Sequence, residues 1–118
     1  MTERSKSNGK TPGDKSRGKT LGGWRQEIDA LDTEILRLLN QRARVACELA
    51  NIKVASGLPA YDGRREQQVL DRVCAGNQGP LNGESVTRIF RGIIRESRKI
   101  GMQSMKEQSS KKQRQMSE

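Results

Sequence analysis

Residues 24–55 read WRQEIDALDTEILRLLNQRARVACELANIKVA, and this stretch decides the fold. Its apolar residues recur in steps of four and three, at positions 24, 28, 31, 35, 38, 45, 49 and 52. That spacing is typical of a helix with one apolar stripe, and no proline or glycine interrupts it. We therefore predict one helix of about 32 residues, which would span about 48 Å. The segment Ser56-Gly57-Leu58-Pro59 should end it.

Two shorter helices are predicted after it. Asp62 is a suitable N-cap for the second helix, which Gly76 should end. Asn82 is a suitable N-cap for the third helix, after a turn-rich segment. The apolar face of this third helix consists of Val86, Ile89, Phe90, Ile93, Ile94 and Ile100. Because no segment has a convincing strand pattern, the predicted fold class is all-α.

The two ends of the chain differ from the middle in composition. Residues 1–20 contain no apolar residue after Met1, and residues 106–118 are similarly polar. Such segments cannot bury enough apolar surface to offset the entropy lost on ordering. We predict a disordered basic tail over 1–20, a folded domain over 21–105 and a polar tail over 106–118. Deletion of 1–20 should leave turnover unchanged.

The formal net charge of +9 lies mostly in these tails. Residues 1–20 hold six lysines or arginines against two acids, and residues 106–118 hold four against two. With one Trp, one Tyr and one Phe, the chain has few rings on which bases could stack. Specific nucleic-acid binding is therefore disfavoured, although the tails suit loose contacts with polyanions. No segment is long and apolar enough to span a membrane or to act as a secretory signal, so we expect a cytoplasmic protein.

The chain contains no histidine and only two cysteines. The absence of histidine excludes Ser-His-Asp and Cys-His nucleophilic mechanisms and histidine-ligated metal sites. Two cysteines are too few for a disulfide framework. An active site in this chain must use carboxylates, cations, hydroxyls and amides.

The long helix is too long for a single compact domain of this size. A domain of about 85 residues has a diameter near 30 Å, and a helix of about 48 Å would leave part of its apolar stripe in water. A second copy of the chain could cover that stripe. Length and pattern therefore predict a homodimer.

Three cations on this helix are candidates for binding an anion. Arg42 interrupts the apolar stripe, and a buried cation requires an acid or a bound anion beside it. Lys53 is about 20° from eclipsed with Arg42 and about 16 Å along the axis, so both side chains could reach one small anion. Arg25 lies about 25 Å from Arg42 and is turned by about 100°, so it could join the same ligand only from an antiparallel partner.

Several motifs together resemble the all-helical chorismate mutases. They are Arg25 followed by IDALD (28–32), LLxxR ending at Arg42, Lys53, the DxxRE cluster of residues 62–66, and Ile93-Ile94 preceding Ser97. Each motif is weak alone, but their order and spacing across residues 24–102 are specific. The resemblance implies an intertwined homodimer of three-helix chains that converts chorismate to prephenate, a step of aromatic amino acid biosynthesis in the shikimate pathway.

The resemblance also implies roles for the cations. Arg42 and Arg25 from the partner would bind the two carboxylates of chorismate, and Lys53 would bind a carboxylate and the ether oxygen. A Claisen rearrangement transfers no proton and needs no nucleophile. Fixed positive charge and a folded substrate conformation are sufficient, so no metal or cofactor is implied.

The remaining roles fall to polar residues of the second and third helices. Glu66 would accept a hydrogen bond from the ring hydroxyl, assisted by the backbone at Asp62, which can also cap its helix. Arg65 would support this cluster, and Ser97 would donate to a carboxylate. Family members usually have Gln or Glu one helical turn after this serine, but here the residue is Gly101. We expect this departure to weaken turnover, and Gly101→Gln to raise it roughly ten- to a hundredfold.

Other functions share this scaffold. Related enzymes eliminate pyruvate from isochorismate or rearrange the 4-amino analogue of chorismate, and a carboxylate at Glu66 suits a hydroxyl or an ammonium group. A third alternative is a non-catalytic helical dimer with an interaction or regulatory role, for which Gly101 is the best evidence. Retention of Arg25, Arg42, Lys53 and Glu66 favours chorismate mutase.

Overall fold

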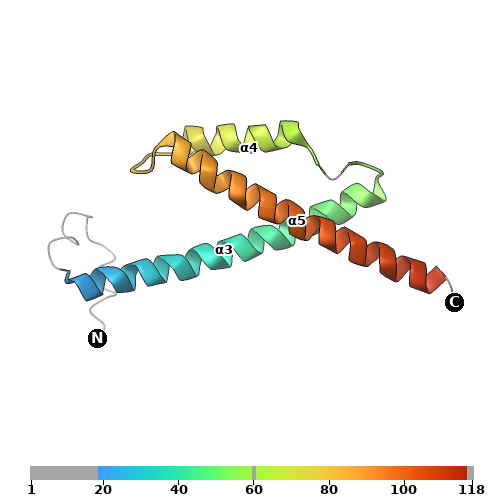
Figure 1. Cartoon of the computed structure of the whole chain (residues 1–118), viewed down its shortest axis with the longest axis horizontal. Coiled ribbons are helices and arrows are strands. Elements are labelled where there is room, and N and C mark those ends of the chain that lie inside the picture. The colour runs from blue at the N-terminus through green and yellow to red at the C-terminus, as the bar shows by residue number, and fades with distance from the viewer. Residues whose placement is uncertain (1–18, 60, 117–118) are drawn as a thin grey trace. The chain divides into compact units, whose positions relative to one another are not determined.

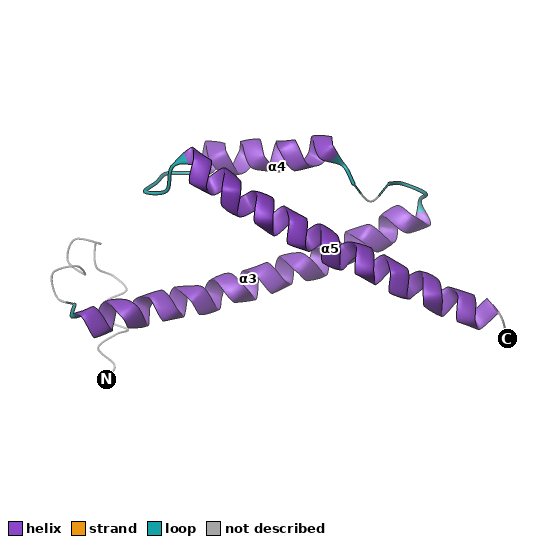
Figure 2. Ribbon diagram, in the orientation of Figure 1, coloured by secondary structure: helices purple, strands orange, loops and turns teal. Residues whose placement is uncertain are grey.

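The computed structural model describes residues 19–59 and 61–116, and helices are the only regular elements in these ranges (Figures 1 and 2). They are α3 (Leu21–Ala55), α4 (Gly63–Gly76) and α5 (Gly83–Met116). The predicted all-α fold with one long N-terminal helix is confirmed. The chain divides within α3 into two units, Met1–Arg37 and Leu38–Glu118, each of which is described by itself.

In the first unit, α3 begins three residues before the predicted start. The Oγ1 of Thr20 accepts a hydrogen bond from the backbone N–H of Gly23 at 3.1 Å, as an N-cap side chain does. Lys19 forms an ion pair with Glu27, and its Nζ lies 4.6 Å from the ring centroid of Trp24. Residues 19–20, which we assigned to the tail, therefore contribute to the start of the helix. The rest of that predicted tail lies outside the described residues.

In the second unit, α4 and α5 form a hairpin (Figure 1). Both predicted N-caps are confirmed, because Asp62 accepts from the backbone N–H of Arg65 at 3.1 Å and Asn82 from that of Ser85 at 2.8 Å. Gly79 in the connecting loop has a φ of 78°, a left-handed conformation that favours glycine. The hairpin buries Val69, Leu70 and Ile94, against which Val73 and Phe90 pack.

The third helix extends beyond the domain boundary that we expected at residue 105. α5 continues to Met116. Residues 102–116 contain no proline or glycine and are rich in Met, Gln and Lys, which are good helix formers. A polar composition limits burial, but it does not prevent a helix from continuing.

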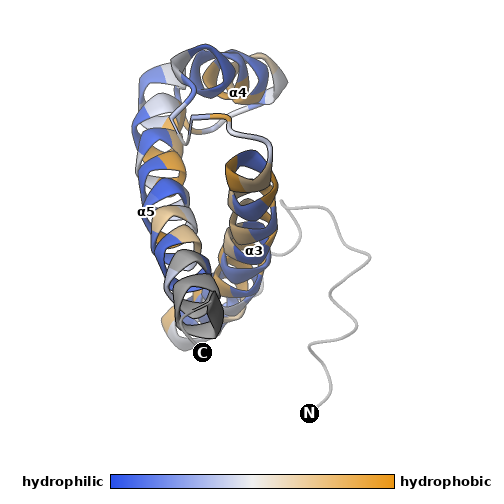
Figure 3. Ribbon diagram, turned by 90° about the vertical axis from the view of Figure 1, so that its right-hand side faces the viewer, coloured by the Kyte–Doolittle hydropathy of each residue, from blue (hydrophilic) through white to orange (hydrophobic). Residues whose placement is uncertain are grey.

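Apolar side chains on α3 remain exposed in the single chain. None of its 35 residues is buried, and Ile28, Leu31 and Ile35 are each more than half exposed. Hydrophobic and hydrophilic residues share the surface of every helix (Figure 3). Among the described residues, no helix is both long and apolar enough to cross a bilayer.

Candidate active site

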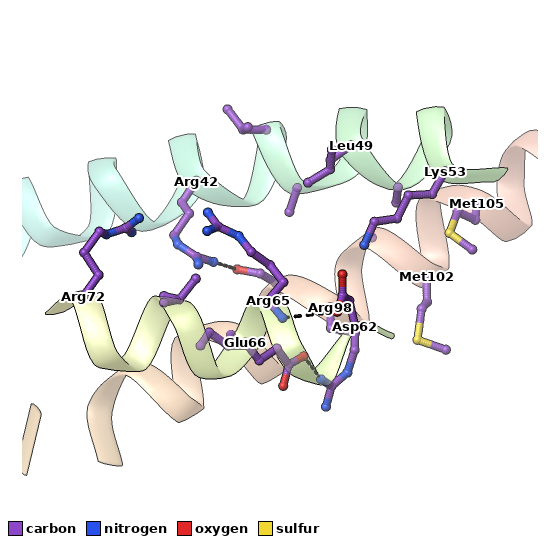
Figure 4. A pocket seen from close by; sticks show the side chains of 17 residues that line it. Arg42, Leu49, Lys53, Asp62, Arg65, Glu66, Arg72, Arg98, Met102 and Met105 are labelled. Atoms are coloured by element: carbon purple, nitrogen blue, oxygen red, sulfur yellow. Dashed lines mark hydrogen bonds and ion pairs between the residues drawn. The ribbon is translucent and has the colours of Figure 1, made fainter. Parts of the chain in front are cut away.

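A cavity of about 340 Å³ opens in the second unit between α4, α5 and the part of α3 that begins at residue 38 (Figure 4). Seven of the eight predicted site residues line it: Arg42, Lys53, Asp62, Arg65, Glu66, Ser97 and Gly101. The eighth, Arg25, belongs to the first unit and is not among the lining residues. Within the second unit, the structure therefore gathers every residue that the sequence indicated.

Arg42 and Ser97 link the long helix to α5 inside this cavity. The Nη1 of Arg42 donates to the Oγ of Ser97 at 2.8 Å. Ser97 is buried, with 9% of its surface exposed. Because its oxygen accepts from the guanidinium, the hydroxyl hydrogen remains available to a ligand. The pair thus presents two kinds of donor, a cation and a hydroxyl.

The lining carries more positive than negative charge. It contains five cationic side chains, from Arg42, Lys53, Arg65, Arg72 and Arg98, and two acidic ones, from Asp62 and Glu66. Burial, and then repulsion by Arg65 and Arg72, lowers the pKa of the Arg42 guanidinium below its ordinary value. Neither Arg65 nor Arg72 forms an ion pair with any described residue. A bound anion would relieve this repulsion.

Arg72 was not predicted from the sequence. It lies on α4, seven residues after Arg65, and the two positions are therefore about 20° from eclipsed. That spacing was the available signal, because two arginines two turns apart share one helix face.

The two acids of the cavity already have partners. Asp62 caps α4, as described above. Glu66, in the first turn of α4, accepts from the Nη1 of Arg98, another residue that was not predicted from the sequence. Over the described ranges, no group of three or more cysteine or acidic side chains is placed to hold a metal ion.

Lys53 marks one end of the cavity. Its side chain points inward from α3, at the end that Met102 and Met105 of α5 also line (Figure 4). A thioether sulfur accepts hydrogen bonds weakly and donates none. Lys53 therefore adds a charged donor to a part of the lining where the methionines donate none.

Gly101 occupies a close approach between α5 and α3. A Cβ at this position would lie 3.3 Å from the Cβ of Ala50 and 3.5 Å from the carbonyl oxygen of Ala46. Ala46, Ala50 and Gly101 all line the cavity, so a side chain at 101 would start on the cavity wall with its first atom against α3. The glycine thus has a packing reason that the sequence did not indicate.

Comparison with known proteins assigns the family. Residues 24–102 match the family described as chorismate mutase type II. The chain belongs to this family. The matched range includes all eight predicted site residues, from Arg25 in the first unit to Gly101 on α5.

The solved structures most relevant to the fold are two chorismate mutases. One, from Helicobacter pylori in complex with prephenate, is 38% identical, with a TM-score of 0.68 over 74% of this chain and 94% of that one. The other, form I of the Thermus thermophilus enzyme, is 35% identical, with a TM-score of 0.65 over 67% of this chain and 99% of that one.

The curated relatives are longer proteins. The bifunctional chorismate mutase/prephenate dehydratase of Neisseria gonorrhoeae is 44% identical over 72 residues, which are 61% of this chain and 19% of that protein. The protein of the same name from Aquifex aeolicus is 38% identical over 59% of this chain and 20% of that protein. The chain thus spans about a fifth of the length of these relatives.

Proposed function

We propose that this chain rearranges chorismate to prephenate. The observation that carries the proposal is the electropositive cavity, which is lined by the family's expected residues from all three helices. The prephenate complex of the Helicobacter pylori relative supports the same ligand class. The dehydratase activity named for the bifunctional relatives is not part of this proposal, because the similarity covers a fifth of their length.

The charge of the cavity suits a substrate with two carboxylates. Arg65 and Arg72 repel Arg42, and a dianion would compensate these charges. In the proposed complex, Arg42 binds one carboxylate and the Ser97 hydroxyl donates to it. Arg72 adds positive charge on the side of α4. Binding should therefore be driven by electrostatic complementarity and should weaken at high salt.

The rearrangement itself requires neither proton transfer nor a nucleophile from the protein. One carbon–oxygen bond breaks and one carbon–carbon bond forms within the same molecule, so no atom enters or leaves. The cavity would hold the flexible substrate folded, with its bond-forming carbons close together. Lys53 would donate to the ether oxygen, on which negative charge grows as its bond to carbon breaks. Glu66 would accept from the ring hydroxyl, with the backbone at Asp62 assisting and Arg65 supporting the cluster.

We further propose that the active species is a homodimer. Its support is the exposed apolar stripe of α3, on which Leu38, Leu49 and Ile52 are also at least half exposed. A second copy would bury that stripe and supply its own Arg25 to the cavity. This arrangement would bring the eighth predicted residue to the site.

A continuous absorbance assay of chorismate loss, with identification of the product, tests the proposal. Prephenate should form, and Arg42→Ala should greatly reduce its formation, because both binding and orientation are lost. Release of pyruvate from isochorismate in a parallel assay, without formation of prephenate from chorismate, would instead indicate the related lyase reaction. A folded protein that converts none of chorismate, isochorismate and the 4-amino analogue would leave the non-catalytic helical dimer as the explanation.

A further inference from the structure

Arg98 and Glu66 form an ion pair in the wall of the cavity (Figure 4). Arg98 follows Ser97 on α5, and its Nη1 donates to the Oε2 of Glu66 on α4. The side chains of Arg98 and Glu66 are only 31% and 27% exposed. The guanidinium carbon of Arg98 also lies 5.0 Å from the ring centroid of Tyr61, a distance that permits a cation–π interaction. Two contacts, one with Glu66 on α4 and one with Tyr61 before α4, therefore hold this guanidinium.

The pair stands between two hollows of the second unit. Arg98 and Glu66 line the main cavity together with Lys53 and Arg42. They also line a second hollow with Tyr61 and other residues of α4 and α5. The guanidinium is thus part of the cavity wall, beside Glu66, which is expected to accept a hydrogen bond from the ring hydroxyl of the substrate.

This arrangement determines what Glu66 can offer to a ligand. Its Oε2 accepts from Arg98, and its Oε1 has no hydrogen-bond partner among the described residues. Glu66 can therefore still accept a hydrogen bond from a ligand, but its negative charge is compensated by Arg98. A hydroxyl needs only an acceptor, whereas an ammonium group also needs uncompensated negative charge and would be repelled by the guanidinium.

We propose that Arg98 is a positioning residue that holds Glu66 and makes the site prefer a hydroxyl over an ammonium group on the substrate's ring. The inference rests on the proposed function, because it specifies which ring substituent that function accepts. The ion pair, rather than Glu66 alone, would discriminate between a ring hydroxyl and a ring ammonium group. A carboxylate alone suits either substituent.

The test compares Arg98→Met, which removes the charge and keeps an unbranched side chain, with Arg98→Lys, which keeps the charge. Arg88→Met is the matched control, because Arg88 lies on the same helix, is exposed and changes the net charge equally. For each protein, kcat/KM is measured with chorismate and with the analogue that carries an amine in place of the ring hydroxyl. Arg98→Met should shift the ratio at least about tenfold toward the amine, about 1.4 kcal/mol of discrimination. Arg98→Lys and Arg88→Met should stay within about threefold of the natural chain.

The outcomes separate this inference from the proposed function. If the natural chain converts chorismate and Arg98→Met leaves the ratio unchanged, the role of Arg98 is refuted and the proposed function stands. If the natural chain converts neither compound, the proposed function fails. The ratio of the two dissociation constants, measured by calorimetry in the same proteins, then decides the role of Arg98. Should Arg98→Met not fold, Arg98→Gln removes the same charge and retains a donor.

Discussion

Replacing Gly101 by alanine tests the close approach of α5 and α3. The added Cβ would lie 3.3 Å from the Cβ of Ala50, whereas carbon atoms in good contact are about 3.5–4.0 Å apart. Ala50 or one of the helices must therefore move by a few tenths of an ångström. Gly92, on the same helix, provides the control, because a Cβ there would meet only the end of the flexible Arg95 side chain, at 3.6 Å.

The expected magnitude follows from two opposing effects. Alanine stabilises a helix interior by about 1 kcal/mol relative to glycine. We expect Gly92→Ala to show this gain in full. At Gly101 the same gain is set against the strain of overpacking, typically about 1–3 kcal/mol. The free energy of unfolding of Gly101→Ala should therefore be about 1–3 kcal/mol lower than that of Gly92→Ala.

Thermal unfolding at one fixed protein concentration measures this difference, since the stability of a dimer depends on concentration. A difference of 1 kcal/mol corresponds to about 4–8 °C in Tm for a domain near this size. If both alanine variants gained the same stability, the helices would not approach closely at Gly101 and the packing explanation would be wrong.

The glutamine variant extends the same reasoning to catalysis. The sequence led us to expect a gain in turnover from Gly101→Gln, because it would restore a hydrogen-bond donor. The structure adds a cost to this substitution, because a Cβ at 101 requires Ala50 or one of the helices to move by a few tenths of an ångström, although Gly101 itself lines the cavity. The gain in turnover therefore stays a prediction, to be measured on fully folded protein. A folded Gly101→Gln variant with tenfold higher kcat would show that the crossing yields and that the donor reaches the substrate.

Three further predictions concern the cavity and the assembly. Lys53→Ala should lower kcat at least about a hundredfold, the scale for loss of one donor to a developing oxyanion; near-normal turnover of the folded variant would contradict the assigned site. Arg72→Ala should raise KM several-fold with a smaller effect on kcat, because it would contribute charge to binding, whereas Arg88→Ala should change neither; equal kinetics for the two variants would argue against a role for Arg72. Light scattering should show a homodimer in solution, and a folded monomer at micromolar concentration would refute the assembly that we propose.

Local signals were sufficient to predict most of the fold. The apolar steps of four and three located α3, and Asp62, Gly76 and Asn82 marked three of the other helix boundaries correctly. These signals act within a few residues of the positions that they determine. The apolar pattern gave no end for the third helix, because residues 106–118 lack apolar surface, whereas helix propensity alone permits α5 to continue to Met116.

The site residues that belong to the family motifs could be predicted from the sequence, and the other residues of the site could not. The motifs led to Arg42, Lys53, Glu66 and Ser97, all of which line one cavity. Arg98 carried no such signal, because its partner Glu66 lies 32 positions earlier and only the packing of α4 against α5 brings the two together. Long-range pairs of this kind depend on how helices pack, which spacing along one helix does not reveal.

Gly101 is interpreted differently from the sequence and from the structure. In the sequence it is a missing donor, and the natural inference is lost catalytic power. In the structure it allows α5 to lie close to Ala46 and Ala50, near the contact at which Cys47 Sγ lies 3.7 Å from the carbonyl oxygen of Ile100. The same packing of α5 on α3 holds Ser97 within hydrogen-bond distance of Arg42. A larger residue at 101 would therefore have to preserve that crossing before any donor it carried could assist the reaction, which is why stability and turnover must be measured on the same variants.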